Sequence, residues 1–70
     1  MTINEIFGKK VKEKRLELNL SQEKLANMAN IDRTYLPEIE RGKRNISLAV
    51  ADKIAKALNV SLTSLLEDYG

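Results

Sequence analysis

The 70-residue chain has no cysteine and no histidine, and these two absences exclude most kinds of reactive site. Without cysteine there are no disulfides and no zinc–thiolate sites. Without histidine the usual nucleophile–base pairs and most sets of metal ligands are missing as well. The carboxylates that remain are scattered among lysines on helix faces. We therefore predict that the protein is not an enzyme and that it carries no cofactor and no metal.

Long apolar runs are also missing, so we expect no transmembrane helix, no signal peptide, no membrane partner and a cytoplasmic location. Hydrophobic residues make up 43% of the chain and charged residues 31%, values typical of a folded globular domain. The net charge of +2 is a weak indication of nucleic-acid binding. The clustering of basic residues at 9–15 and 41–44 says more, although a solvated helix face explains the first cluster equally well.

Apolar spacing and capping residues predict an all-α protein with no strands. Ser21, Ser47 and Ser61 each precede an apolar-periodic segment and can cap the N-terminus of a helix. Asn19 and Asn59 stand where helices should end. Within a single domain of residues 1–70, the predicted helices span residues 3–19, 22–29, 33–41, 48–58 and 62–67.

Two of these helices have a clear apolar face. In the first, Ile3, Phe7, Val11 and Leu18 form one stripe at spacings of four and seven residues. In the fourth, the residues expected to face inward are Leu48, Ala51, Ile54, Ala55 and Leu58. Arg15 interrupts the first stripe. Because an unpaired buried charge is costly, Arg15 needs a partner or must extend its stem over the edge of the core.

Residues 21–42 have the pattern of two short helices joined by a tight turn. Asn30 tolerates a turn conformation, Asp32 can cap the second helix, and Gly42 can end it in a left-handed conformation. Two helices of this length with so short a connection fit the helix-turn-helix motif, whose second helix enters the major groove of DNA.

The sequence resembles a known family in three segments: residues 21–26 (SQEKLA), 32–36 (DRTYL) and 39–48 (IERGKRNISL). They are similar to the helix-turn-helix domains of the phage-repressor (Xre-like) family, and look most like the controller proteins of restriction–modification systems. SQEKLA marks only the broad family, whereas the other two segments narrow the likeness to controllers. The resemblance covers nearly the whole chain and implies a compact five-helix, repressor-like fold that binds double-stranded DNA.

The resemblance also implies a partner for Arg15. In this family the arginine at that position pairs with the glutamate just before the end of the recognition helix, which is Glu40 here. We therefore expect an Arg15–Glu40 ion pair that ties the first helix to the third. The alternative is that the Arg15 stem covers the edge of the core and its charge reaches solvent.

Three residues are candidates for base contacts. Arg33 and Thr34 open the recognition helix, the part that approaches base edges in this motif. Arg33 can donate to guanine O6 and N7, and Thr34 offers a hydroxyl together with a methyl group for thymine. Controller proteins read bases with the matching Arg-Thr pair, whereas without that resemblance both would be ordinary first-turn surface residues. Arg44, in the basic loop that follows, can also reach a base edge.

The residues predicted to contact the DNA backbone are Gln22, Tyr35, Lys43, Asn45 and Ser47. Gln22 and Ser47 lie at helix starts, where side-chain and backbone donors can hold a phosphate. Tyr35 has a purely structural alternative, since its ring can pack against the second helix. A basic loop such as residues 43–45 is usually just solvated, but its place after the recognition helix favours contact.

Two further residues of the recognition helix affect these predictions. Glu38 can accept a hydrogen bond from cytosine N4 or can repel DNA in a wrong register, and it is left outside the contact set. Pro37 lacks the N–H that would bond to the Arg33 carbonyl, so we expect it to cost stability or to change the angle of the helix.

A single recognition helix makes too few base contacts for strong specificity, so we expect a two-fold homodimer on half-sites roughly 34–36 Å apart. The C-terminal end should supply the interface, since 70 residues leave no room for a separate dimerisation domain. The candidate interface residues are Val60, Leu62, Leu65 and Tyr69. Alternatively, these leucines close the core of the monomer, as Leu65 or Leu66 would most readily do.

The predicted function is that of a dimeric, sequence-specific regulator of transcription that controls restriction–modification genes, including its own, from a two-fold symmetric operator. A dimer beside a promoter can recruit RNA polymerase, and one lying across it can block access. A phage or mobile-element repressor, or an antitoxin of the same fold, is the nearest alternative. The alternative from another class is a protein-interaction adaptor that binds no DNA.

Overall fold

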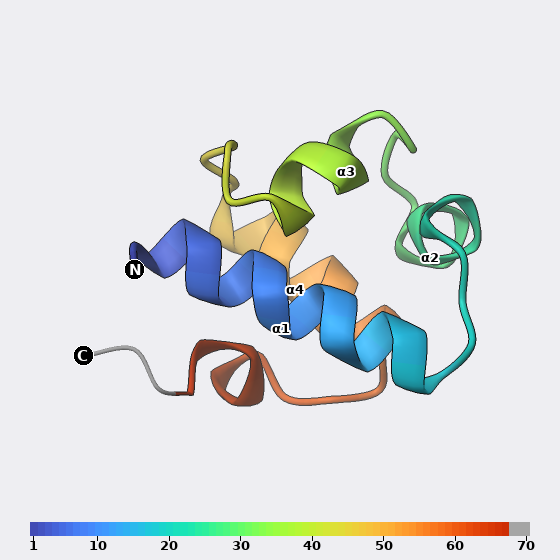
Figure 1. The fold of residues 1–70 in the computed structure, drawn as a ribbon. Helices are drawn as coiled ribbons and strands as arrows, with labels where there is room; N and C mark the ends of the chain where they lie inside the picture. Colours follow the sequence, from blue (N-terminus) through green and yellow to red (C-terminus); the bar gives the residue numbers. More distant parts are fainter. Residues whose placement is uncertain (68–70) are drawn as a thin grey trace.

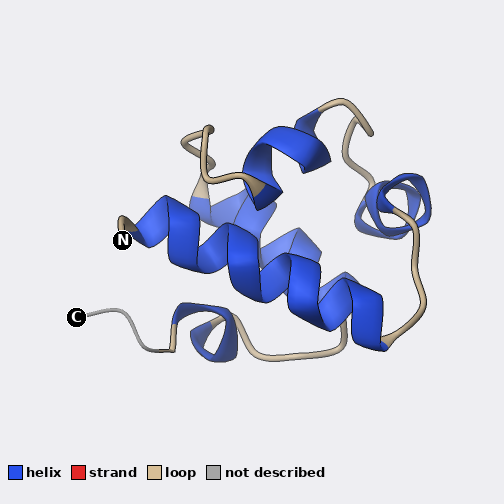
Figure 2. Cartoon of the chain, in the orientation of Figure 1, coloured by secondary structure: helices blue, strands red, loops and turns tan. Residues whose placement is uncertain are grey.

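The computed structural model describes residues 1–67 as four α-helices and one 3₁₀ turn (Figures 1 and 2). The elements are α1 (Ile3–Glu17), α2 (Gln22–Ala29), α3 (Tyr35–Glu40), α4 (Leu48–Ala57) and the 3₁₀ turn η1 (Thr63–Leu66). No strand occurs in this part of the chain, which confirms the all-α prediction. The prediction of a fifth α-helix is wrong, because Ser64 and Leu65 donate their N–H groups to carbonyls three residues earlier and form a 3₁₀ turn.

Capping hydroxyls begin three of the helices. Thr2 and Glu5 form a reciprocal capping box at the start of α1, with hydrogen bonds of 2.8 and 3.1 Å. Ser21 and Ser47 each accept the N–H of the residue three positions later, at 3.0 and 3.1 Å. Their predicted roles as helix caps are confirmed. Each such cap contributes about 1 kcal/mol to stability.

Left-handed residues end the helices and fix the turns between them. Asn19, Asn30 and Asn59 have φ values of 58°, 57° and 60°, and Gly42 has 72°. The residue after each of the four donates its N–H to a carbonyl five residues earlier, at 3.0 Å in every case. This is the Schellman arrangement. After each asparagine the next residue is apolar and packs against the core, so the chain turns sharply without exposing it.

The helices surround one small core. In Figure 1, α3 lies above α1 and η1 lies below it, while α2 is seen nearly end-on. α1 contacts α3 and η1, and α2 contacts α3 and α4. The buried cluster consists of Phe7, Val11, Leu25, Ala29, Leu36, Ile39, Ala51, Ile54, Ala55, Leu58 and Leu65. None of the described helices combines the length and the hydropathy needed to cross a bilayer.

Three residues expected to face inward are exposed instead. Ile3 is 42% exposed, Leu18 is 46% exposed and Leu48 is 78% exposed. Ile3 and Leu48 are the first residues of α1 and α4, and Leu18 follows the last residue of α1. Their spacing places them on the apolar face, but at its ends, where residues 1–67 leave them largely uncovered.

Gly8 brings α1 and α3 into direct contact. A β-carbon at this position would collide with the carbonyl oxygen of Ile39 and would lie 2.8 Å from that of Glu40. Only glycine allows such an approach without displacing the backbone. The C-terminal end of α3 therefore rests on α1, which leaves the N-terminal end of α3 to project.

Candidate nucleic-acid interface

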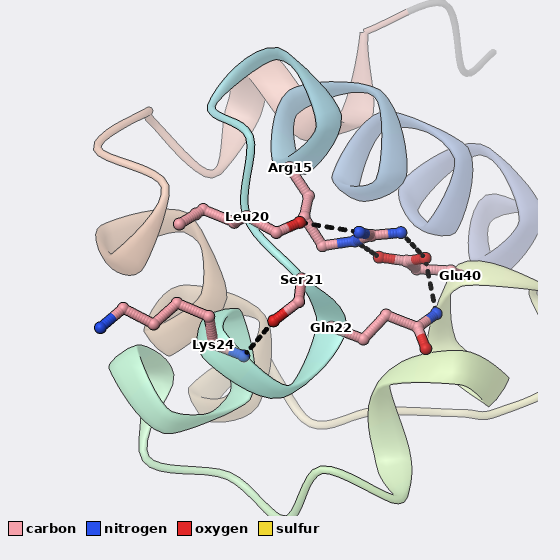
Figure 3. Close-up of polar contacts among 6 residues, drawn as sticks. All are labelled: Arg15, Leu20, Ser21, Gln22, Lys24 and Glu40. Carbon is pink, nitrogen blue, oxygen red and sulfur yellow. Dashed lines mark hydrogen bonds and ion pairs between the residues drawn. The ribbon is translucent and has the colours of Figure 1, made fainter.

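A buried ion pair fixes α3 against α1. The Arg15 Nε atom lies 2.7 Å from Glu40 Oε2, and its Nη2 atom lies 3.0 Å from Oε1 (Figure 3). The two side chains are only 9% and 4% exposed. These are the two residues that the family resemblance pairs, and their contact is bidentate, the strongest geometry for this kind of pair.

Two further hydrogen bonds extend the pair to the start of α2. Arg15 Nη1 donates to the carbonyl oxygen of Leu20 at 2.8 Å, and Gln22 Nε2 donates to Glu40 Oε1 at 3.0 Å (Figure 3). Within residues 1–67 no buried side-chain nitrogen or oxygen lacks a hydrogen-bond partner. α1, α2 and α3 are therefore joined at one fully satisfied polar site.

The start of α3 differs from the prediction. Asp32 does not cap a helix that begins at residue 33; its Oδ1 atom accepts the Thr34 N–H at 2.9 Å and the Thr34 hydroxyl at 2.8 Å. The helix begins at Tyr35. The hydrogen bonds from Thr34, the backbone one first, lower the pKa of Asp32. This turn leaves Arg33 and Thr34 exposed ahead of α3.

The later start of α3 changes the role of Pro37. With Tyr35 as the first helical residue, Pro37 is the third. N–H groups in the first turn of a helix have no partner within the helix, so the proline removes no intrahelical hydrogen bond there. The expected cost of an interior proline therefore does not apply.

Both candidate base-contacting arginines are paired with carboxylates of the same motif. Arg33 Nη1 lies 3.1 Å from Glu23 Oε2, between the start of α3 and α2. Arg44 Nη1 lies 3.1 Å from Glu38 Oε1, and its guanidinium carbon lies 4.2 Å from the centroid of the Tyr35 ring. Sequence reasoning did not identify Glu23 as a partner, although its exposed position in the first turn of α2 is compatible with such a role.

The basic loop between α3 and α4 is anchored at both ends. The N–H of Lys43 donates to the Glu38 carbonyl at 3.0 Å. The Asn45 Oδ1 atom accepts from Asn4 Nδ2 at 2.6 Å, and Ser47 caps α4. Nothing in the sequence indicated Asn4, since it is an ordinary polar residue 41 positions from its partner. The loop nevertheless presents the side chains of Lys43, Arg44 and Asn45 to solvent.

The residues predicted to form the dimer interface differ in how far they are exposed. Val60 and Leu62 are half-buried, whereas Leu65 is 2% exposed and belongs to the core, so it offers almost no surface to a partner. Tyr69 lies outside the described residues. A shallow apolar hollow of about 170 Å³ lies beside Leu62. Its lining residues are Ile3, Asn4, Phe7, Ile46, Ser47, Leu48, Ala51, Leu62 and Leu66.

Comparison with known sequences places this geometry in context. The model of the helix-turn-helix family, described as "Helix-turn-helix", matches residues 11–65. Control protein C.BamHI of Bacillus amyloliquefaciens is 51% identical over 63 residues, which cover 89% of this chain and 78% of that protein. Control protein C.SmaI of Serratia marcescens is 43% identical over 70 residues, which cover 100% of this chain and 83% of that protein.

A solved structure agrees in fold with the chain described above. The restriction–modification controller protein C.AhdI from Aeromonas hydrophila superimposes with a TM-score of 0.85 at 40% sequence identity. The match covers 89% of this chain and 94% of that chain. The likeness therefore extends over nearly the full length of both proteins.

Proposed function

The chain belongs to the helix-turn-helix family, among the control proteins of restriction–modification systems, and we propose that it regulates transcription by binding DNA sequence-specifically as a homodimer. One observation carries the proposal. The far end of α3 is fixed by Gly8 and the Arg15–Glu40 pair, while Arg33 and Thr34 stand exposed at its leading end. A rigid helix that presents an arginine and a hydroxyl in this way suits readout in the major groove.

The proposed contacts form one continuous set along the motif. Arg33, Thr34 and Arg44 contact bases, and the backbone is held by Gln22, Tyr35, Lys43, Asn45 and Ser47. All eight residues are exposed or half-buried, and they come from the starts of α2, α3 and α4 and from the basic loop. The Gln22 amide gives one N–H to Glu40 and keeps its second N–H for a phosphate oxygen.

The proposed dimer uses Val60, Leu62 and the apolar hollow that Leu62 lines. Leu48 also lines this hollow and is 78% exposed, a large apolar area to leave open to solvent. A two-fold dimer places two copies of α3 on successive turns of the duplex, which doubles the number of base contacts.

Leu48→Lys tests this interface without disturbing the core. We expect equilibrium sedimentation to show a dimer for the wild type and a monomer for Leu48→Lys at the same micromolar concentration. Leu16→Lys is the matched control. Leu16 is also exposed, at 54%, but lies near the C-terminal end of α1. Its variant should remain a dimer. A Leu48→Lys variant that stays dimeric would place the interface elsewhere.

The regulatory output follows from where the dimer sits. Beside a promoter it recruits RNA polymerase, and across a promoter it blocks access. We propose that the controlled genes are those of a restriction–modification system, including the gene of the regulator itself. The proposal draws on the sequence identity between this chain and control proteins such as C.BamHI.

Selection of bound duplexes from a randomised DNA pool, at near-physiological salt, tests the proposed function. We expect enrichment of a two-fold symmetric site with half-sites about one helical turn apart. The absence of any enriched sequence, from protein that is folded by circular dichroism, would contradict DNA readout and favour a protein-interaction adaptor.

A further inference from the structure

Both neighbours of Arg44 have partners within the fold, whereas the Arg44 side chain reaches solvent. The backbone N–H of Lys43 donates to the Glu38 carbonyl, and the side chain of Asn45 accepts a hydrogen bond from the side chain of Asn4. Arg44 itself is 41% exposed at its side chain. Rotation of its side chain therefore allows Arg44 to change partner.

The present partners of Arg44 both belong to the recognition helix. Its Nη1 atom lies 3.1 Å from Glu38 Oε1, and the guanidinium lies over the ring of Tyr35 at 4.2 Å. The Glu38 side chain is 45% exposed. An ion pair as exposed as this one contributes little to the stability of the fold, so the pair can exchange for a phosphate or a base at small cost.

We infer that Glu38 is a specificity-determining residue. It holds Arg44 over the Tyr35 ring until operator DNA replaces Glu38 as the partner of Arg44. The inference rests on the proposed DNA-binding function. On non-operator DNA, Arg44 has no base to contact, so it stays with Glu38 and contributes no net charge to phosphate binding. On operator DNA the base contact compensates for the loss of the ion pair, and Arg44 transfers to the duplex. Glu38 thereby weakens non-specific binding more than specific binding.

The experiment compares Glu38→Gln with the wild type on two duplexes, the selected operator and a shuffled sequence, over a range of salt concentrations. In the variant Arg44 is free to bind phosphate on any sequence. The log–log salt slope on the shuffled duplex should therefore steepen by about one per monomer, since each phosphate contact releases about one counterion. The slope on the operator should not change. Affinity for the shuffled duplex should rise about two- to fivefold more than affinity for the operator.

Two controls separate this mechanism from a general charge effect. Glu17→Gln makes the same change of net charge on α1, where Glu17 pairs with Lys14 at 3.1 Å. It should not steepen the slope on the shuffled duplex by one per monomer, and it should leave the operator slope unchanged. In an Arg44→Ala background, Glu38→Gln should no longer steepen the slope on the shuffled duplex. Thermal melting establishes that each variant is folded.

Several outcomes would overturn the inference. Equal changes of slope on the two duplexes would show that Glu38 acts only as one unit of charge. A loss of operator affinity would show instead that Glu38 contacts DNA or orients Arg44 for it. In either case the wild-type protein still distinguishes operator from shuffled DNA, so the proposed function would stand while the role of Glu38 would fall.

Discussion

The buried Arg15–Glu40 pair and the exposed arginine–glutamate pairs of the helix-turn-helix motif have the same chemistry but different roles. Arg15 and Glu40 are 9% and 4% exposed and share two charge-assisted hydrogen bonds. Arg33 and Glu23 are 69% and 63% exposed and share one contact of 3.1 Å. The first pair is shielded from solvent, whereas the second is surrounded by it.

This difference distinguishes the scaffold, in which Arg15 and Glu40 hold the helices together, from the proposed DNA-binding surface, on which Arg33 and Arg44 lie. Breaking a buried pair leaves an uncompensated charge inside the protein, which is strongly unfavourable. An exposed pair contributes at most about 1 kcal/mol and can be replaced by water or by a ligand. The buried pair therefore fixes the direction of α3, and the exposed arginines remain free to exchange their carboxylates for DNA.

Removal of one partner of the buried pair should have the largest effect. Arg15→Ala leaves Glu40 charged and buried, so we expect the free energy of unfolding to fall by about 3–5 kcal/mol, as measured by urea denaturation. Lys14→Ala, which breaks an exposed pair on the same helix, should cost less than about 1 kcal/mol. A loss of that small size for Arg15→Ala, or no coupling in a double-mutant cycle with Glu40→Ala, would contradict the scaffold role.

Gly8→Ala should weaken the same contact from the backbone side. Alanine normally stabilises a helix relative to glycine by about 1 kcal/mol. Here its β-carbon meets the carbonyl groups of Ile39 and Glu40, so we expect a net loss of about 1–3 kcal/mol in a thermal or urea melt. An increase in stability would mean that α1 and α3 can separate without consequence.

Glu23→Gln should have the smallest effect on folding. It removes the carboxylate that faces Arg33 on the exposed side of the motif. We expect a change in unfolding free energy of less than about 0.5 kcal/mol, measured under the same urea conditions as Arg15→Ala. A loss above about 2 kcal/mol would remove the distinction between scaffold and surface pairs.

Local chemistry in the sequence predicted much of the scaffold. Ser21 and Ser47 were identified as caps because a hydroxyl before an apolar-periodic segment has few other roles, and both cap their helices. Arg15 within an apolar stripe required, on physical grounds, either a partner or a route for its charge to solvent. The identity of that partner came from the family resemblance, since no spacing rule connects positions 25 residues apart.

Other features depend on tertiary context that the sequence does not carry. Leu48 has the spacing of a core residue but is the first residue of its helix and is 78% exposed. Asp32 has two ways to use its carboxylate, and the turn with Thr34 displaced the expected helix cap. Among the contact residues, the pairing of Arg44 with Glu38 depends on the path of the loop and could not be deduced from composition or periodicity.

The most direct test of the account measures equilibrium binding of the wild type, Arg33→Ala and Arg41→Ala to the selected operator and to a shuffled duplex at one salt concentration. Arg41 is an exposed arginine at the C-terminal end of α3, whereas Arg33 precedes the N-terminal end. Arg41→Ala therefore removes one positive charge, as Arg33→Ala does, but from the opposite end of the helix. We predict that Arg33→Ala lowers operator affinity by about 1–3 kcal/mol per half-site and abolishes the preference for the operator over the shuffled duplex. Arg41→Ala should lower the affinity for both duplexes by the same factor. An undiminished operator preference in Arg33→Ala would contradict the assignment of Arg33 as a base-reading residue.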